Sequence, residues 1–119
     1  MDKKRILVID DEEGFTDLVK EILEQTGRYV VETVNRGKMA LFVARAFKPD
    51  LVLLDVMIPD MDGTCVADQI ENDKNIGNVP IVFVSALFEH SPNITDRDCI
   101  LLSKPVGVRE LIDCVQKNL

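Results

Sequence analysis

Apolar residues along the chain fall into short continuous runs that alternate with segments of helical periodicity. The runs predict five strands, at residues 5–9, 29–34, 51–54, 81–84 and 99–102. Apolar residues spaced three and four apart predict helices, at residues 15–23, 38–47, 62–73 and 108–119. This alternation predicts an α/β fold, in which right-handed crossovers build a parallel sheet with helices on both faces.

Residues that break or cap helices support these boundaries. Gly27 is expected to end the first helix, and Pro49 follows the second. Asp62 is expected to cap the third helix. Residues 87–98 have little helical periodicity and a proline at position 92, so they contain either a short helix after Pro92 or none.

The composition is that of one globular domain spanning residues 1–119, with 46% hydrophobic and 29% charged residues. No apolar run approaches the roughly 20 residues that span a bilayer. The first residues also lack the apolar stretch of a secretory signal, so we expect a cytoplasmic protein without membrane association. The net charge of −7 disfavours direct binding to nucleic acid. The three cysteines show no CxxC spacing and are expected to be reduced.

Charged and hydroxyl groups follow four of the predicted strands. Asp10 and Asp11 follow the first strand, Asp55 the third, Ser85 the fourth and Lys104 the fifth. The carboxyl ends of parallel strands share one edge of an open sheet, where ligands bind. We therefore expect three carboxylates, a hydroxyl and an ammonium group in one pocket, which could hold a divalent cation and a phosphoryl group.

The carboxylates of Asp10, Asp11 and Asp55 would lie close together with little positive charge nearby. Carboxylate oxygens and water suit Mg²⁺, which uses few protein ligands. Asp11, or Glu12 beside it, could instead only start the first helix, where an acidic side chain interacts favourably with the helix dipole. That interpretation is weaker for Asp10 and Asp55, since each directly follows a buried strand.

Asp55 is the best candidate for a nucleophile, because a carboxylate can attack phosphorus and form an acyl phosphate. A nearby cation would neutralise charge on the transferred group. Lys104 would supply a second positive charge, and Ser85 could donate a hydrogen bond to a phosphoryl oxygen. Each of these two could alone be an ordinary loop residue, but their placement at successive strand ends favours a shared site.

These residues and the segment around Asp55 resemble a known family. Asp10-Asp11, the run PDLVLLDVMIPDMDG at residues 49–63, Ser85-Ala86 and Lys104-Pro105 are similar to the receiver domain of two-component response regulators. The resemblance covers essentially the whole chain, and the central run is highly specific. It implies a flavodoxin-like, doubly wound sheet of five parallel strands in the order 2-1-3-4-5, flanked by five helices.

The resemblance implies that the protein is a phosphorylation-driven signalling switch. Asp55 would be the phosphoacceptor, receiving a phosphoryl group from a histidine kinase or a phosphotransfer protein. The surface around the fourth helix and fifth strand would then control an output protein or an attached domain, and a homodimer could form there. Such a domain assists its own phosphorylation and dephosphorylation, but it is not an enzyme that turns over a metabolite.

Roles for the other site residues follow from the same resemblance. Asp10 and Asp11 would bind Mg²⁺ together with the phosphoacceptor, Asp10 through water, and the backbone carbonyl of Met57 would be a further ligand. Ser85 would be the switch hydroxyl. Lys104, joined to the following proline by a cis peptide, would contact the phosphate.

Two features depart from the pattern of the family. The position three residues before Lys104 is aromatic in typical receivers but is Leu101 here, so coupling through a moving aromatic ring is not expected. The segment of the fourth helix is short and weakly helical, which predicts an output face that is either atypical or ordered on binding a partner. Met57 and Leu87 are both apolar, could hinder an attacking water, and predict slow self-dephosphorylation.

Other functions explain these residues less well. A phosphorylation-independent interaction module with the same fold is favoured slightly by Leu101 and the weak fourth helix, but the intact set of site residues opposes it. A Mg²⁺-dependent phosphohydrolase would place a second aspartate two residues after Asp55, where Met57 stands. A dinucleotide-binding domain would need a GxGxxG motif after the first strand. His90, the only histidine, is expected to be an exposed bystander.

Overall fold

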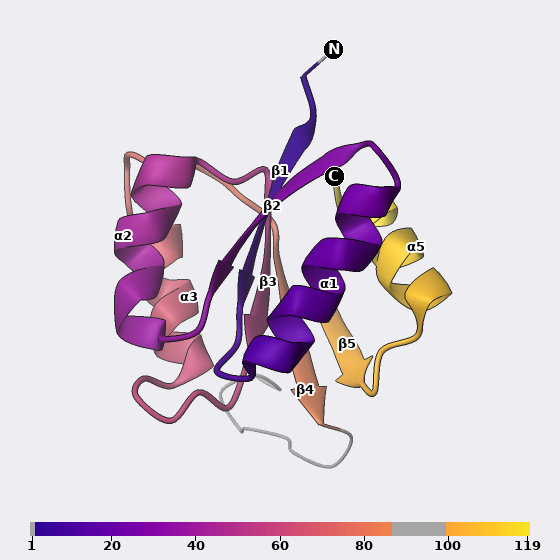
Figure 1. Ribbon diagram of the computed structural model, residues 1–119. Helices are drawn as coiled ribbons and strands as arrows, with labels where there is room; N and C mark the ends of the chain where they lie inside the picture. The colour runs from indigo at the N-terminus through magenta and orange to yellow at the C-terminus, as the bar shows by residue number, and fades with distance from the viewer. Residues whose placement is uncertain (1, 87–99) are drawn as a thin grey trace.

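The computed structural model describes residues 2–86 and 100–119, which form a parallel sheet between two layers of helices (Figure 1). The strands are β1 (Lys4–Ile9), β2 (Tyr29–Val34), β3 (Leu51–Asp55), β4 (Ile81–Ala86) and β5 (Ile100–Lys104). They pair in parallel in the order β2-β1-β3-β4-β5. The predicted α/β class, doubly wound sheet and strand order are confirmed.

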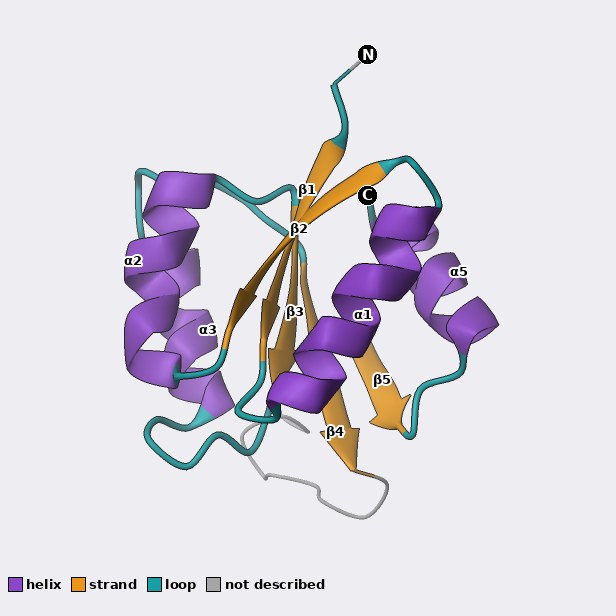
Figure 2. Ribbon diagram, in the orientation of Figure 1, coloured by secondary structure: helices purple, strands orange, loops and turns teal. Residues whose placement is uncertain are grey.

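Helices cover both faces of this sheet. They are α1 (Glu13–Gln25), α2 (Gly37–Phe47), α3 (Gly63–Glu71) and α5 (Val108–Asn118). Figure 2 shows α1 and α5 over one face and α2 and α3 over the other. The four helices predicted in these segments are confirmed, with small shifts at their ends. The predictions for residues 87–98, including the fourth helix, Leu87 and His90, lie outside the described residues.

The parallel register brings the carboxyl ends of the strands to one edge of the sheet, at the bottom of Figure 1. Asp55 pairs with Val84, and the next residue of β4, Ser85, is in register with β5. Three strands therefore run further than their apolar runs predicted, since β3 ends at Asp55, β4 at Ala86 and β5 at Lys104. Hydrogen bonding to a neighbouring strand extends them beyond the hydrophobic residues.

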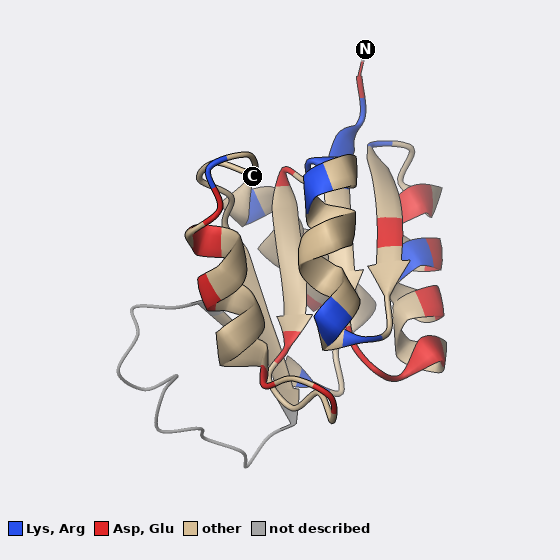
Figure 3. Ribbon diagram, turned by 90° about the vertical axis from the view of Figure 1, so that its left-hand side faces the viewer, with Lys and Arg blue, Asp and Glu red and all other residues tan. Residues whose placement is uncertain are grey.

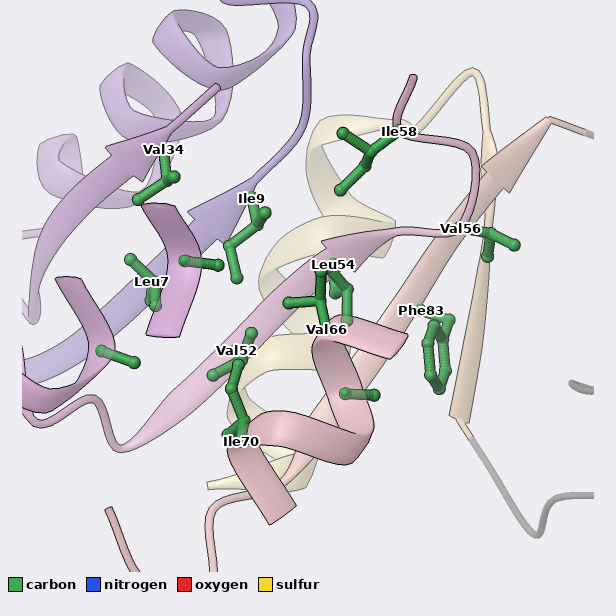
Figure 4. Close-up of a cluster of buried hydrophobic side chains, with 13 residues drawn as sticks. Leu7, Ile9, Val34, Val52, Leu54, Val56, Ile58, Val66, Ile70 and Phe83 are labelled. Carbon is green, nitrogen blue, oxygen red and sulfur yellow. The ribbon is translucent and has the colours of Figure 1, made fainter. Parts of the chain in front are cut away.

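Both faces of the sheet are buried, and alternate side chains of a central strand enter opposite cores. Leu7 and Ile9 of β1 belong to the core beneath α2 and α3 (Figure 4). Ile6 and Val8 of the same strand belong to the core beneath α1 and α5. Each of these four residues is at most 1% exposed, and complete burial of such a side chain contributes about 1.5–3 kcal/mol. The central strands are thus a well-packed platform for the residues at their ends.

Two aspartates fasten the loop between β3 and α3. Asp62 caps α3 as predicted, accepting a hydrogen bond from the backbone N–H two residues later at 2.8 Å. Asp60 reaches α2, where its carboxylate accepts hydrogen bonds from the N–H groups of Gly37 (2.9 Å) and Lys38 (3.0 Å). Arg36, which precedes α2, makes no side-chain cap. Asp60 therefore caps this helix from a distant part of the chain.

The described helices are all short. Among residues 2–86 and 100–119, no helix has the length and apolar character needed to cross a bilayer. The longest, α1, has 13 residues, whereas a membrane-spanning helix needs about 20.

Candidate functional site

Three carboxylates gather at the carboxyl edge of the sheet. Asp10 and Asp11 follow β1 directly, and Asp55 is the last residue of β3. One carboxylate oxygen from each residue lies within 4.8 Å of the other two. Asp10 is 1% exposed and Asp55 is 6% exposed, whereas Asp11 is open to solvent. The structure thus brings these side chains together, as their positions in the sequence predicted.

The ammonium group of Lys104, the last residue of β5, neutralises part of this charge. Its Nζ lies 2.7 Å from Asp10 Oδ2 and 3.9 Å from Asp55 Oδ2. Only 17% of the Lys104 side chain is exposed, so the pair with Asp10 is largely shielded from water. The Lys104-Pro105 peptide is cis, as predicted.

Two residues that sequence analysis did not connect with Lys104 also hold its ammonium group. Glu12 Oε1 lies 3.1 Å from Lys104 Nζ, and the centroid of the Phe15 ring lies 4.4 Å from the same atom. An aromatic ring attracts a cation through the negative charge of its face. Glu12 is the N-cap residue of α1, and its backbone carbonyl accepts hydrogen bonds from the N–H groups of Phe15 and Thr16. Its side chain makes no cap and pairs with the lysine. These contacts join residues as many as 92 positions apart, and no local signal in the sequence reveals them.

Hydrogen bonds from the backbone and from Asn35 orient the buried carboxylates and the end of β1. Asp10 Oδ1 accepts a hydrogen bond from the N–H of Glu12 at 3.0 Å. Asp55 Oδ1 accepts one from the N–H of Met57 at 3.2 Å. The side-chain amide of Asn35 donates to the carbonyl oxygen of Asp10 at 2.8 Å, which joins the ends of β1 and β2. The two carboxylates are therefore held in place before any ligand binds.

The pKa of Asp55 is raised to about 7. Burial is the main cause, and the negative charge of Asp10 adds to it. Lys104 and the N–H of Met57 lower the pKa of Asp55, because both stabilise the ionised carboxylate. Burial alone would lower the pKa of Lys104, but Asp10, Asp55 and Glu12 together raise it. The lysine therefore remains charged at the pH at which Asp55 gains or loses its proton.

The other predicted site residues lie around this cluster. Met57 is in the loop after β3 and is 58% exposed. Ser85 is buried in β4, one residue beyond the partner of Asp55. Leu101, three residues before Lys104, is 44% exposed on β5, which lies at the edge of the sheet.

Gly63 is a residue whose importance the sequence did not reveal. It begins α3, and its N–H donates a hydrogen bond to the carbonyl oxygen of Val56 at 3.0 Å. A Cβ atom here would overlap the backbone carbonyl oxygen of Asp55 and lie 2.8 Å from the Cα of Val56. Glycine thus permits α3 to start directly against the backbone that carries the Asp55 carboxylate.

The donor atoms of the cluster suit a hard divalent cation. Mg²⁺ prefers carboxylate, carbonyl and water oxygens, and proteins usually hold it with one or two carboxylates and several waters. Three carboxylates and one ammonium group give the cluster a negative balance of charge, which a divalent cation would offset. Asp10, Asp11 and Asp55 therefore fit such an ion.

Comparison with known proteins identifies the family. Residues 6–116 match the model of the response regulator receiver domain. The chain belongs to the response regulator receiver family. The resemblance seen in the sequence is thereby confirmed, and the acidic triad is typical of the Mg²⁺ site of receiver domains. Receiver domains act in two-component signalling, interact with histidine kinases and are not classical enzymes.

This receiver domain covers very different shares of its curated relatives. It is 33% identical over 118 residues to the DNA-binding dual master transcriptional regulator RpaA of Synechocystis. That match covers 97% of this chain and 48% of RpaA. It is 28% identical over 119 residues to the polar-differentiation response regulator DivK of Brucella anthropi. That match covers 98% of this chain and 96% of DivK. The chain thus spans about half the length of RpaA but nearly all of DivK.

A solved structure supports the same assignment. The chemotaxis response regulator CheY4 of Vibrio cholerae matches with a TM-score of 0.85 at 25% sequence identity. The match covers 99% of this chain and 100% of that chain. The receiver fold therefore accounts for the whole arrangement of sheet and helices described above.

Proposed function

We propose that this receiver domain is a phosphorylation switch, in which Asp55 accepts a phosphoryl group from the phosphohistidine of a histidine kinase or a phosphotransfer protein. The observation that carries the proposal is the convergence of Asp10, Asp11 and Asp55 with Lys104 at one edge of the sheet. Such a cluster offers a nucleophile, ligands for a cation and a positive charge for a phosphoryl oxygen.

In the proposed transfer, a carboxylate oxygen of Asp55 attacks phosphorus and forms an O–P bond. The P–N bond to the donor imidazole breaks, the nitrogen leaves with the electron pair, and the product is an acyl phosphate. The attacking carboxyl must be ionised. Because the pKa of Asp55 is about 7 in the absence of a cation, a bound cation would increase the reactive fraction at neutral pH.

The proposed ligands of Mg²⁺ are Asp10, Asp11 and Asp55, Asp10 through water, together with the backbone carbonyl of Met57. When bound, the ion would supply positive charge that offsets the negative charge on the transferred group. Asp11 is the solvent-exposed member of the acidic triad, so it is the carboxylate that a cation arriving from solvent would meet first.

Lys104 and Ser85 would bind the phosphoryl group after transfer. Lys104 Nζ is 3.9 Å from Asp55 Oδ2, so a small movement would bring it to a phosphoryl oxygen on that residue. The hydroxyl of Ser85, which is 3% exposed near the end of β4, would donate a hydrogen bond to the same group. This contact would link the phosphorylation state to the end of β4.

The phosphorylated form is proposed to lose its phosphoryl group slowly. Met57 is two residues from Asp55 and 58% exposed, so its apolar side chain is presented to solvent close to the acyl phosphate. Together with Leu87, it would hinder attack by water. A phosphoryl half-life of seconds would contradict this part of the proposal.

The proposed output is a change at the surface of β5 and the segment before it, which would control a partner protein, an attached domain or a homodimer. The chain spans 48% of RpaA and 96% of DivK, so similar sequences occur both within longer regulators and as nearly whole proteins. A single domain over residues 1–119 and a cytoplasmic location belong to the same proposal. The proposal does not include direct binding to nucleic acid, because the net charge of the chain is −7.

A phosphorylation-independent interaction module is the second candidate function. Leu101 favours it, since an exposed leucine on β5 replaces the aromatic side chain expected three residues before Lys104. The same fold could then present a fixed surface to a partner. The acidic triad would have no role in this function, which makes it the weaker candidate.

The test is to incubate the protein with Mg²⁺ and acetyl phosphate and to measure its intact mass beside an Asp55→Asn control. We expect a phosphate-sized gain on the unmodified chain and no gain on the control. If neither acetyl phosphate nor a competent histidine kinase produces this gain, the interaction module becomes the better account.

A further inference from the structure

The exposed face of α2 is apolar at its centre and basic toward its ends. Phe42 is 69% exposed and Met39 is 47% exposed, and they share one side of the helix because they are three residues apart. Lys38 and Arg45 are exposed and lie on the same side, one before and one after this pair. The opposite side of α2 is buried. A helix with apolar residues on both sides is normally covered on both.

The charge of this helix contrasts with the rest of the chain. Residues 36–48 contain none of the 21 Asp and Glu residues of a chain with net charge −7. The same segment contains four of the 14 Lys and Arg residues: Arg36, Lys38, Arg45 and Lys48. Figure 3 shows α2 with blue near both ends and tan between them, while α3 beside it carries red. Residues 36–48 are thus a basic strip without an acidic residue in a chain that is acidic as a whole.

We propose that the α2 face, defined as Lys38, Met39, Phe42 and Arg45, is a docking surface for an acidic amphipathic helix of a partner protein. Phe42 and Met39 would be the apolar anchors, since aromatic residues and methionine are enriched at interfaces. Carboxylates beside the apolar stripe of the partner would pair with Lys38 and Arg45. This mode of binding does not use the acidic cluster, so the proposal does not depend on phosphorylation.

The shape of the basic strip selects a single helix as the occupant. A helix lying along α2 would meet Lys38 and Arg45 and would lie over the one described helix that contains no Asp or Glu. An anionic membrane is wider than one helix and would also face the acidic residues of α3, which lies beside α2, and these would repel it. A second copy that bound through its own α2 face would place its Lys38 and Arg45 against the same cations, which would repel one another.

Two contacts hold this face ready for binding. Arg45 Nε lies 2.7 Å from Asp73 Oδ2, yet the Arg45 side chain remains 52% exposed. A guanidinium group has five N–H donors, so one ion pair leaves donors for a second carboxylate. At the other end, Asp60 caps the N–H groups of Gly37 and Lys38. Fixing the Arg45 guanidinium and the first turn of α2 in advance reduces the entropy lost on binding.

The test is a titration of ¹⁵N-labelled, unphosphorylated protein with a synthetic helix of about 18 residues, long enough to cover α2. The peptide carries Leu and Phe along one side and Glu beside them, and a control peptide has the same composition in scrambled order. We expect the amphipathic peptide to change amide shifts mainly in residues 36–48, and we expect no such change with the scrambled peptide. The affinity should fall with added salt.

Matched variants identify the residues responsible. Phe42→Gln and Lys38→Glu should each weaken binding by about tenfold or more. Leu18→Gln changes an apolar residue that is 52% exposed on α1, across the sheet, and should leave the affinity unchanged. Because these positions are exposed, the variants should keep the fold, which amide shifts outside the substituted helix would verify.

Several results would overturn the proposal. These are an equal response to the scrambled peptide, shift changes outside residues 36–48, and unchanged affinity in Phe42→Gln. Binding to vesicles of phosphatidylserine and phosphatidylcholine in preference to the peptide would make the α2 face a membrane site instead. Self-association that Phe42→Gln abolishes would make it an interface between copies of this chain.

Discussion

Lys104 Nζ lies 3.9 Å from Asp55 Oδ2, which is beyond hydrogen-bonding distance. The lysine is instead paired with Asp10 at 2.7 Å and with Glu12 at 3.1 Å, and it lies over the ring of Phe15. The charge of Asp55 is therefore only partly compensated, in agreement with its raised pKa. In this structure, Lys104 compensates the charges of Asp10 and Glu12 more than that of Asp55, the proposed phosphoacceptor.

Removing Lys104 should destabilise the fold, because the buried Asp10 carboxylate would lose the positive charge that neutralises it. Lys104→Met leaves Asp10, which is 1% exposed, without its ion-pair partner. We expect the free energy of unfolding to fall by about 3 kcal/mol, measured by urea denaturation without Mg²⁺. The double variant Asp10→Asn/Lys104→Met should recover much of this loss. A single-variant loss below about 1 kcal/mol would show that the pair behaves like one on the surface.

The stability of the Mg²⁺-free protein should depend on pH through Asp55. Its pKa is about 7 in the folded state and about 3.9 in an unfolded chain, so the folded state binds the proton more tightly. Stability should therefore be greatest at low pH in this window, fall as pH rises from about 4 to 7, and level off above that. Asp10, Asp11 and Lys104 are the charged groups that act on this carboxyl.

The Asp55→Asn variant isolates this effect. It removes the buried charge while keeping an oxygen that can accept the hydrogen bond from Met57, so it should be more stable than the unmodified protein at pH 8, by about 2 kcal/mol. The difference should shrink toward pH 4, which urea denaturation at several pH values would show. A difference that is independent of pH would mean that the Asp55 carboxyl ionises at its ordinary pKa.

Magnesium should stabilise the fold by mass action at the acidic cluster. At a concentration 100 times its dissociation constant, a ligand that binds only the folded state adds about 2.7 kcal/mol. Asp11→Asn is the sharpest variant, because Asp11 is exposed and its loss should change stability without Mg²⁺ by no more than about 0.5 kcal/mol. Thermal unfolding across a Mg²⁺ series should show a smaller stabilisation in this variant. An undiminished response would place the ion elsewhere.

A pair of glycine substitutions should have opposite effects. Gly63→Ala would place a Cβ against the backbone of Asp55 and Val56, and should destabilise the protein by about 3 kcal/mol. At Gly14, in α1, a Cβ would have no neighbour within 4 Å, so Gly14→Ala should stabilise by about 0.5 kcal/mol through helix propensity. Urea denaturation of both variants tests the pair. Equal effects would mean that the backbone near Asp55 yields easily.

The sheet could be predicted because its central strands are buried on both faces. Residues 51–54 form an unbroken apolar run, and such runs followed by helical periodicity leave few alternatives to a parallel α/β sheet. The positions of Asp10, Asp55 and Lys104 after these runs then predicted the acidic cluster, because parallel strands end at one edge.

Contacts made by single long-range hydrogen bonds could not be predicted in this way. Asp60 reads in the sequence as a turn former, yet its carboxylate caps α2, 23 residues away. Glu12 starts α1 as its N-cap residue, as the sequence suggests, but its pairing with Lys104 has no local signal. The ends of β4 and β5 were also predicted too early, because polar residues such as Ser85 extend strands through hydrogen bonding to their neighbours.

The codon for Gly63 tolerates almost no change of the encoded amino acid. Every single-base change in a glycine codon that alters the encoded amino acid either adds a β-carbon or ends translation. At residue 63 the added atom meets the main chain of Asp55 and Val56 and not the end of a movable side chain. Random mutation at this codon therefore has no mild substitution within reach, although the residue has no acidic, basic or nucleophilic group of its own.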